Sequence, residues 1–310
     1  MIAAGEPHVR RPLVGYAMVL VAATFFGVNG SVAKVALSSG ISSFRLTEAR
    51  CVGAWIGLTL IALARSRSGL RIRRGEVLRL AVFGIGGVAL VQLFYFLAIH
   101  RLAIGIALVI QYLGPLLVAI YARTFGHEHV RRRIWAALAL SLTGLSLVVE
   151  LWQGVALDGL GVVFALISAV IFAAYLLFAE IEIARRDSVS LMAWGFFFAT
   201  VFWTVVQPWW SFPAGRVAET VSLQGRLAGW HLPVWALVLW VVVLGSIVPF
   251  SLIVGALRHV SATRVGIAAM LEPVVATVVA WAWLQETLAP VQLVGAGVVL
   301  AAILLAQTAR

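Results

Sequence analysis

The chain has 310 residues, of which 63% are hydrophobic and only 11% are charged, with a formal net charge of +11. Soluble domains carry roughly a quarter of charged residues, so this composition leaves too little polar surface to coat a water-soluble globule. The apolar runs are uninterrupted and helix-length, which excludes the short alternating strands of a membrane β-barrel. The sequence therefore predicts an all-α integral membrane protein.

Ten apolar runs follow one another along the chain, with no room for a soluble domain between them. In chain order, the predicted transmembrane helices are Leu13–Leu37, Phe44–Ala64, Val77–Ile99, Ala103–Thr124, Ile134–Leu151, Gly159–Ala179, Ser190–Trp210, Val234–Leu257, Ala262–Leu284 and Pro290–Gln307. The first run is too long for a cleaved signal peptide, so we expect it to remain as a helix.

Nearly all the positive charges are arginines that lie between these runs, which favours loops facing anionic lipid over a nucleic-acid surface. With a cytoplasmic N-terminus, 17 of the 23 basic residues fall on the cytoplasmic side and 6 fall outside. The positive-inside bias therefore predicts that both termini are cytoplasmic.

The two halves of the chain repeat one another. Ala98–Glu128 aligns without gaps with Ala256–Glu286 at an offset of 158 residues, and the first spans of the halves align at an offset of 146 residues. Because each half has five spans, an odd number, the second half must be inverted relative to the first. We predict two inverted five-helix repeats, residues 1–151 and 152–310, with the substrate near the midplane where they meet.

The chain resembles the drug/metabolite transporter superfamily, specifically the proteins with two EamA domains. The residues that carry the resemblance are Phe25-Phe26-Gly27-Val28-Asn29 through Lys34, Arg50, Leu271-Glu272-Pro273, Leu284-Gln285-Glu286 and Gln292 through Ala296. The resemblance implies a secondary carrier of the bacterial inner membrane that exports amino acids or other small metabolites. We expect no cofactor, no nucleic-acid partner, and a monomer or homodimer in the lipid bilayer.

Glu272 lies near the centre of the ninth span, where a carboxylate costs roughly 2.5–3.5 kcal/mol on insertion scales. A carboxylate at this depth is tolerated when it forms an ion pair, binds a proton or contacts water. We predict that it contacts a substrate amine or couples transport to protons. The alternative is a structural carboxyl group bonded to a neighbouring helix. The first half has Gly114 at this position, so either role belongs to one half only.

Four residues are predicted to form gates. Pro115 and Pro273 each remove a helix hydrogen bond and free a carbonyl group one turn back, which needs a new partner. The alternative to a hinge at these prolines is a kink that serves packing alone. Lys34 and Arg50 lie toward the outer ends of the first two spans, where snorkelling or salt bridges are the alternatives to a gate. Arg45 and Glu48 are spaced to form an ion pair.

Uncharged polar residues within the spans are predicted to line a slot that binds the substrate together with Glu272. They are Asn29, Gln92, Tyr95, Gln111, Tyr112, Ser168, Tyr175 and Ser246. Each alone is also explained by an interhelical hydrogen bond worth roughly 0.6 kcal/mol.

Other functions are less well supported by the residues present. No His/Cys/Asp cluster has metal-ligand spacing, no phosphate-binding loop occurs, and no catalytic constellation is found, so we do not expect an enzyme. A multidrug or cation exporter of the same fold, a membrane-embedded lipid enzyme, and a receptor or scaffold remain as alternatives.

Overall fold

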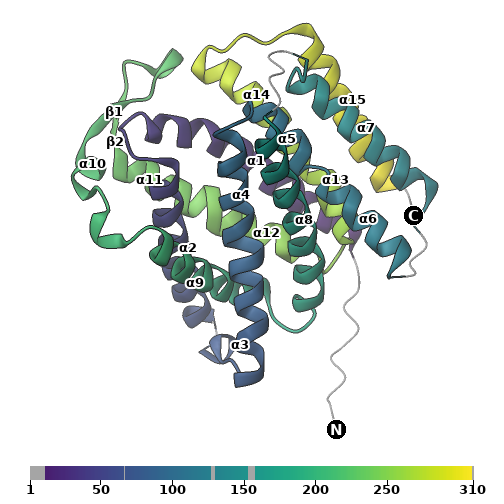
Figure 1. The fold of residues 1–310 in the computed structure, drawn as a ribbon, viewed down its shortest axis with the longest axis horizontal. Helices are drawn as coiled ribbons and strands as arrows, with labels where there is room; N and C mark the ends of the chain where they lie inside the picture. The colour runs from purple at the N-terminus through teal and green to yellow at the C-terminus, as the bar shows by residue number, and fades with distance from the viewer. Residues whose placement is uncertain (1–10, 66, 127–129, 153–157, 309–310) are drawn as a thin grey trace.

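The computed structural model describes residues 11–65, 67–126, 130–152 and 158–308, which form a helical bundle with one short β-hairpin (Figure 1). The first half consists of α1 (Pro12–Leu37), α2 (Ser43–Arg65), η1 (Arg67–Leu70), α3 (Arg74–Ala81), η2 (Val82–Leu90), α4 (Val91–Ile99), α5 (Ile104–Gln111), α6 (Gly114–Thr124) and α7 (Arg132–Val148).

The second half consists of α8 (Gly159–Glu182), α9 (Ser188–Val206), η3 (Trp209–Ser211), α10 (Ala214–Ala218), β1 (Thr220–Ser222), η4 (Gly225–Leu227), β2 (His231–Pro233), α11 (Val234–Val242), η5 (Val243–Ile247), α12 (Val248–Ala256), α13 (Ala262–Ala269), α14 (Leu271–Leu284) and α15 (Pro290–Thr308). The antiparallel β1–β2 hairpin lies in the long connection after the seventh span.

Nine helical segments in the described part of the chain are long and apolar enough to cross a membrane. The remaining predicted span is α7, whose 17 residues reach the lower end of the range that spans a bilayer. The chain is therefore an all-α multi-pass membrane protein, as predicted, and with α7 it has ten spans.

Several span ends differ from the prediction by one to four residues, and two of these differences have a clear local cause. The seventh helix ends at Val206 rather than Trp210, because Gln207 precedes Pro208 and takes an extended conformation. The fifth helix ends at Val148 rather than Leu151, and Glu150 has a positive φ of 49° that breaks the helix.

The halves pack in a reciprocal pattern. The first helix of the first half, α1, packs against α11 to α14 of the second half, and the first helix of the second half, α8, packs against η2 and α4 to α6 of the first. The equivalent helices α2 and α9 pair with each other, as do α7 and α15, which lie side by side in Figure 1. This exchange is the pattern expected of two inverted repeats about a two-fold axis.

Close approaches at two glycines follow the same symmetry. A Cβ atom on Gly15 would collide with His259 and Val260, and one on Gly161 would collide with Arg101 and Leu102. The contacted residues differ by the 158-residue offset of the sequence repeat. Equivalent helix starts therefore pack on equivalent helix ends of the opposite half.

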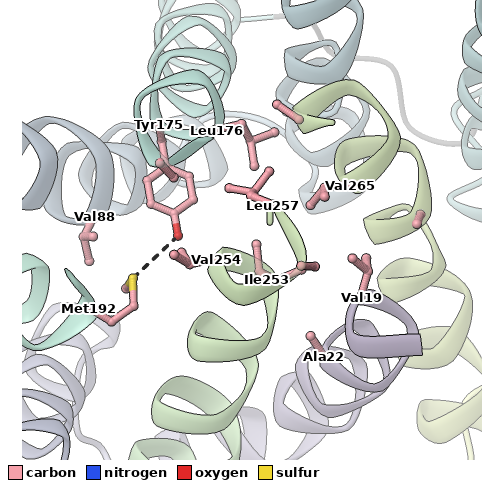
Figure 2. Close-up of a cluster of buried hydrophobic side chains, with 14 of the residues drawn as sticks. Val19, Ala22, Val88, Tyr175, Leu176, Met192, Ile253, Val254, Leu257 and Val265 are labelled. Atoms are coloured by element: carbon pink, nitrogen blue, oxygen red, sulfur yellow. Dashed lines mark hydrogen bonds between the residues drawn. The ribbon is translucent and has the colours of Figure 1, made fainter. Parts of the chain in front are cut away.

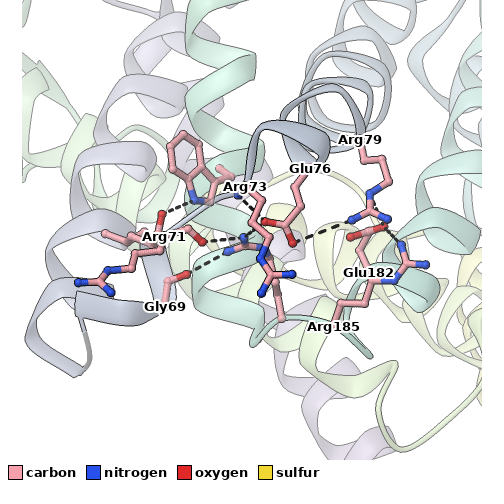
Figure 3. A network of polar contacts seen from close by, with 10 residues as sticks. Gly69, Arg71, Arg73, Glu76, Arg79, Glu182 and Arg185 are labelled. Atoms are coloured by element: carbon pink, nitrogen blue, oxygen red, sulfur yellow. Dashed lines mark hydrogen bonds and ion pairs between the residues drawn. The ribbon is translucent and has the colours of Figure 1, made fainter. Parts of the chain in front are cut away.

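A network of ion pairs lies at the end of the bundle formed by η1 and α3, which we call the arginine end (Figure 3). Arg186 donates to the Glu76 carboxylate at 2.8 Å and to the carbonyl oxygens of Gly69 and Arg71. Nearby, Glu182 accepts from Arg185 at 2.7 Å. The opposite end of the bundle carries the β-hairpin, and we call it the hairpin end.

Candidate functional site

A cavity of about 340 Å³, the central cavity, lies between the two halves. Helices α1, α2, α4, α5, α8, α12 and α14 and the segment η2 contribute to its wall. The lining residues are Phe26, Asn29, Gly30, Arg50, Gly87, Val88, Val91, Gln92, Tyr95, Leu108, Gln111, Phe172, Tyr175, Phe250, Ile253 and Glu272. The cavity thus combines an aromatic surface with two charged groups and several amides.

The fourth and ninth spans, which contain Pro115 and Pro273, are both broken beside this cavity. The fourth span divides into α5, which ends at Gln111, and α6, which has Pro115 in its first turn. The ninth span divides into α13, which ends at Ala269, and α14, which starts two residues before Pro273. Proline has no N–H group and clashes with the preceding turn, so both breaks follow from the sequence.

Tyr112 connects the two breaks. Its hydroxyl group lies 3.2 Å from the carbonyl oxygen of Ala269 and 3.0 Å from Oε2 of Glu272. The Ala269 carbonyl is the one that Pro273 frees, so the carbonyl group predicted to need a partner has one. Glu272 also lies in the first turn of α14, where the helix dipole favours a negative charge.

Two π-helical segments flank the cavity at equivalent positions, η2 in the third span and η5 in the eighth. A Cβ atom on Gly87 would collide with the Tyr175 ring, and one on Gly245 would collide with the Asn29 amide. Asn29 and Tyr175 are equivalent residues at the 146-residue offset of the repeat. Gly87 and Gly245 are equivalent residues at its 158-residue offset. Single π turns within α-helices occur frequently at functional sites.

Arg50 reaches across from α2 to the second half. Its Nε donates to Ser246 Oγ at 3.1 Å, and Ser246 in turn donates to the Val241 carbonyl oxygen at 2.9 Å. The guanidinium carbon lies 5.9 Å from the centre of the Phe250 ring. We predicted Arg50 at an outer gate, but the structure places it in the wall of the central cavity.

The amide side chains form a second polar group on the first-half side of the cavity. Gln111 donates to Ser168 at 3.1 Å, and Ser168 donates to the Val91 carbonyl oxygen. Gln92 donates to the Val88 carbonyl oxygen at 3.1 Å. The amide oxygens of Gln92 and Asn29 are buried and have no hydrogen-bond partner among the described residues.

The predicted substrate-binding residues divide into two layers. Those in the cavity wall are Asn29, Gln92, Tyr95, Gln111, Tyr175 and Glu272, and those behind it are Tyr112, Ser168 and Ser246. Tyr175 contributes its ring to the wall, while its hydroxyl group points toward the Met192 sulfur in a buried cluster (Figure 2). The second layer bonds to side chains of the first and orients them.

The phenylalanine residues of the wall were not predicted from the sequence. Phe26 and Phe172 are equivalent residues at the 146-residue offset, and Phe250 packs edge-on against Phe26 at 5.1 Å. The match of Phe26 with Phe172 was visible in the repeat and was the available signal. Phe250 carries no such signal, because its equivalent in the first half is Gln92.

The remaining predicted gate residues lie outside the cavity wall. Pro115 packs against Gly266 of α13. Lys34 lies at the hairpin end, where its exposed ammonium group pairs with Glu286 at 2.6 Å and joins α1 to the end of α14. The predicted ion pair between Arg45 and Glu48 is confirmed at 2.7 Å.

Comparison with known proteins identifies the family. A model described as the EamA-like transporter family matches residues 13–150 and 159–308. The chain belongs to this family. Its membership confirms the resemblance to the drug/metabolite transporter superfamily, and both matches together cover nearly all of the described residues.

Named relatives from this family are bacterial exporters. The threonine/homoserine exporter RhtA of Escherichia coli (strain K12) is 30% identical over 234 residues, which cover 75% of this chain and 72% of that protein. RhtA of Salmonella typhimurium (strain LT2) is 28% identical over the same length. One crystal structure of a protein at 17% sequence identity has a TM-score of 0.74 and covers 95% of both chains, so the overall fold is shared.

Proposed function

We propose that this protein is a secondary transporter of the inner membrane that exports amino acids or related small metabolites by alternating access. The observation that carries the proposal is a cavity between two inverted halves, with Arg50 and Glu272 in its wall. The similarity to threonine/homoserine exporters supports this substrate class. Broken helices on both sides of the cavity supply the mobile half-helices that such carriers use.

Glu272 is proposed as the residue that couples export to protons. It is the acidic residue of the cavity wall, it lies at the start of a half-helix, and Tyr112 bonds to one of its oxygens. A carboxyl group in such a position binds a proton or a substrate amine at the cost of rearranging only one hydrogen bond.

Purified protein in proteoliposomes provides the test. We expect wild-type protein to exchange radiolabelled threonine in counterflow and to accumulate it under a pH gradient. Glu272→Gln keeps the shape and one acceptor oxygen of the side chain but does not titrate, so it is expected to retain downhill exchange at saturating threonine and to lose accumulation. Equal transport by wild-type protein with and without the pH gradient would exclude proton coupling.

We infer the orientation from the charges at the two ends of the bundle. The arginine end carries Arg71, Arg73, Arg79, Arg185 and Arg186, which favours the cytoplasm. The hairpin end carries the exposed Trp209, Trp210, Trp230 and Trp235, which suit a membrane interface. Accessibility of single cysteines introduced at both ends tests this orientation.

Export of aromatic or lipophilic cations is a second candidate function, favoured by the rings of Phe26, Phe172, Tyr175 and Phe250 around Glu272. The positive charge of Arg50 in the same wall opposes it. Competition of such cations with threonine in the counterflow assay separates the two functions.

A further inference from the structure

Arg50 and Glu272 carry opposite charges and line the same cavity from different halves of the molecule. Among the described residues, no ion pair joins them directly; the acidic partner of a neighbouring α2 arginine, by contrast, is Glu48 at 2.7 Å from Arg45. A cation and an anion that line one small cavity without a direct ion pair are both available to charged groups of a ligand.

The second half orients Arg50 for such a contact. Ser246 of η5 fixes its Nε, and the Phe250 ring lies beneath the guanidinium group. A guanidinium group has five N–H donors, and the bond to Ser246 uses one of them. Its planar fork matches the geometry of a carboxylate and binds it through two parallel hydrogen bonds.

The first half orients Glu272. Tyr112 donates to Oε2, and a carboxylate has room for further donors on its two oxygens. The amide side chains of Asn29 and Gln92 belong to the same wall. An ammonium group has three N–H donors, and the carboxylate oxygens of Glu272 can accept from it.

The polarity of the wall is not symmetric, although the fold is. The repeat pairs Gln92 with Phe250 and Glu272 with Gly114, so an amide or charged residue in one half has an apolar or small residue as its equivalent in the other. An asymmetric wall of this kind binds a ligand in a single orientation. Because the cavity is only about 340 Å³, both charged residues are within reach of one small molecule.

We infer that the central cavity binds its substrate as a zwitterion, with the substrate carboxylate on Arg50 and the substrate ammonium group on Glu272. The inference rests on the proposed function and adds the recognition chemistry of the same site. Arg50 is then a residue that determines specificity rather than a gate. The α-carboxylate and α-ammonium groups of the substrate occupy both charged residues of the wall. Among the described residues of the wall, no charged one is left for a charged side chain, so amino acids with uncharged side chains are the preferred class.

Inhibition of radiolabelled threonine counterflow by four unlabelled compounds of similar size tests the inference. The compounds are threonine and three analogues of it: its methyl ester, 1-amino-2-propanol without the carboxylate, and 3-hydroxybutyrate without the ammonium group. We expect wild-type protein to prefer threonine at least tenfold over each of the others. Arg50→Gln is expected to weaken threonine inhibition about tenfold and to leave inhibition by the methyl ester within threefold, so the preference collapses.

Arg65→Gln, at the exposed end of the same helix, is the matched control and is expected to keep the full preference. Ser246→Ala gives a second readout if Arg50→Gln does not fold, since it removes only the bond that orients Arg50. It is expected to lower the preference for threonine over its methyl ester by about threefold.

The outcomes separate the two proposals. Wild-type protein that exchanges no amino acid contradicts the proposed function and the zwitterion site together. Wild-type protein that exchanges threonine, combined with folded Arg50→Gln or Ser246→Ala variants that keep the full preference for threonine over its methyl ester, overturns the zwitterion site alone.

Discussion

At the scale of single residues, the site depends on hydrogen bonds that cross from one half to the other. Tyr112 of the first half bonds to Glu272 and to the Ala269 carbonyl group of the second, and Ser246 of the second half bonds to Arg50 of the first. Each charged side chain of the cavity is therefore oriented by the opposite half. A bond to a charged group is worth about 1.5–3 kcal/mol, which exceeds that of a neutral pair.

Tyr112→Phe removes a single oxygen atom and is predicted to destabilise the protein by about 1.5–3 kcal/mol, because the Glu272 carboxylate and the Ala269 carbonyl group lose the same donor. The matched control is Tyr121→Phe on α6, whose side chain is exposed. Its effect is expected to stay within about 0.5 kcal/mol. Thermal unfolding in detergent measures both, and equal midpoints for the two variants would contradict the assignment.

At the scale of helices, the cavity exists because four spans depart from regular α-helix. Two are broken at prolines, and two contain the π-helical segments η2 and η5. A break or a π turn redirects the side chains that follow it. The departures place Gly87 and Gly245 where the side chains of Tyr175 and Asn29 pack closely on them.

Gly245→Ala tests this close packing. The added methyl group would collide with the Asn29 amide, so we predict destabilisation of about 1–3 kcal/mol and weaker substrate binding. Gly86→Ala is the matched control in η2, because nothing lies within 4 Å of the position its Cβ would take. The control is expected to be neutral or slightly stabilising, since glycine in a helix costs about 0.5–1 kcal/mol relative to alanine. Similar losses in both variants would argue against a tight contact at Gly245.

At the scale of the whole molecule, the halves are joined by interfaces that the repeat makes reciprocal. The helices α7 and α15 pack through Gly144 and Gly295, each of which lies against the backbone of the other. Small residues permit this approach where lipid gives no hydrophobic driving force between helices. At the arginine end, Arg186 adds a polar connection from the second half to Glu76 and the η1 region of the first.

Arg186→Gln is predicted to destabilise the protein by about 1.5–3 kcal/mol, because it removes an ion pair together with two bonds to carbonyl groups. The neighbouring Arg185→Gln is the control. Arg185 also has an ion pair at 2.7 Å, but its side chain is 48% exposed, so we expect a loss of about 1 kcal/mol or less. Denaturant unfolding measures the difference, and a larger effect for Arg185→Gln would contradict the role of Arg186.

The amino-acid sequence by itself determined the number of spans, the repeat, the breaks at Pro115 and Pro273, and Glu272 as a costly charge within the membrane. These features are local, because hydrophobic run length, missing N–H groups and charge act on the segment that contains them. The span ends at Val206 and Val148 were missed by a few residues for an equally local reason, a pre-proline residue and a positive φ.

Only the tertiary structure decided which side chains meet. Arg50 bonds to Ser246 across 196 positions of the chain, and Tyr112 bonds to Glu272 across 160. Hydrophobic periodicity is weak in helices that are apolar on every side, so the sequence does not tell which face of α2 meets the cavity. That face is set by the packing of α2 against α9 and α11. This packing places Arg50 in the wall of the cavity, whereas the sequence predicted it at a gate.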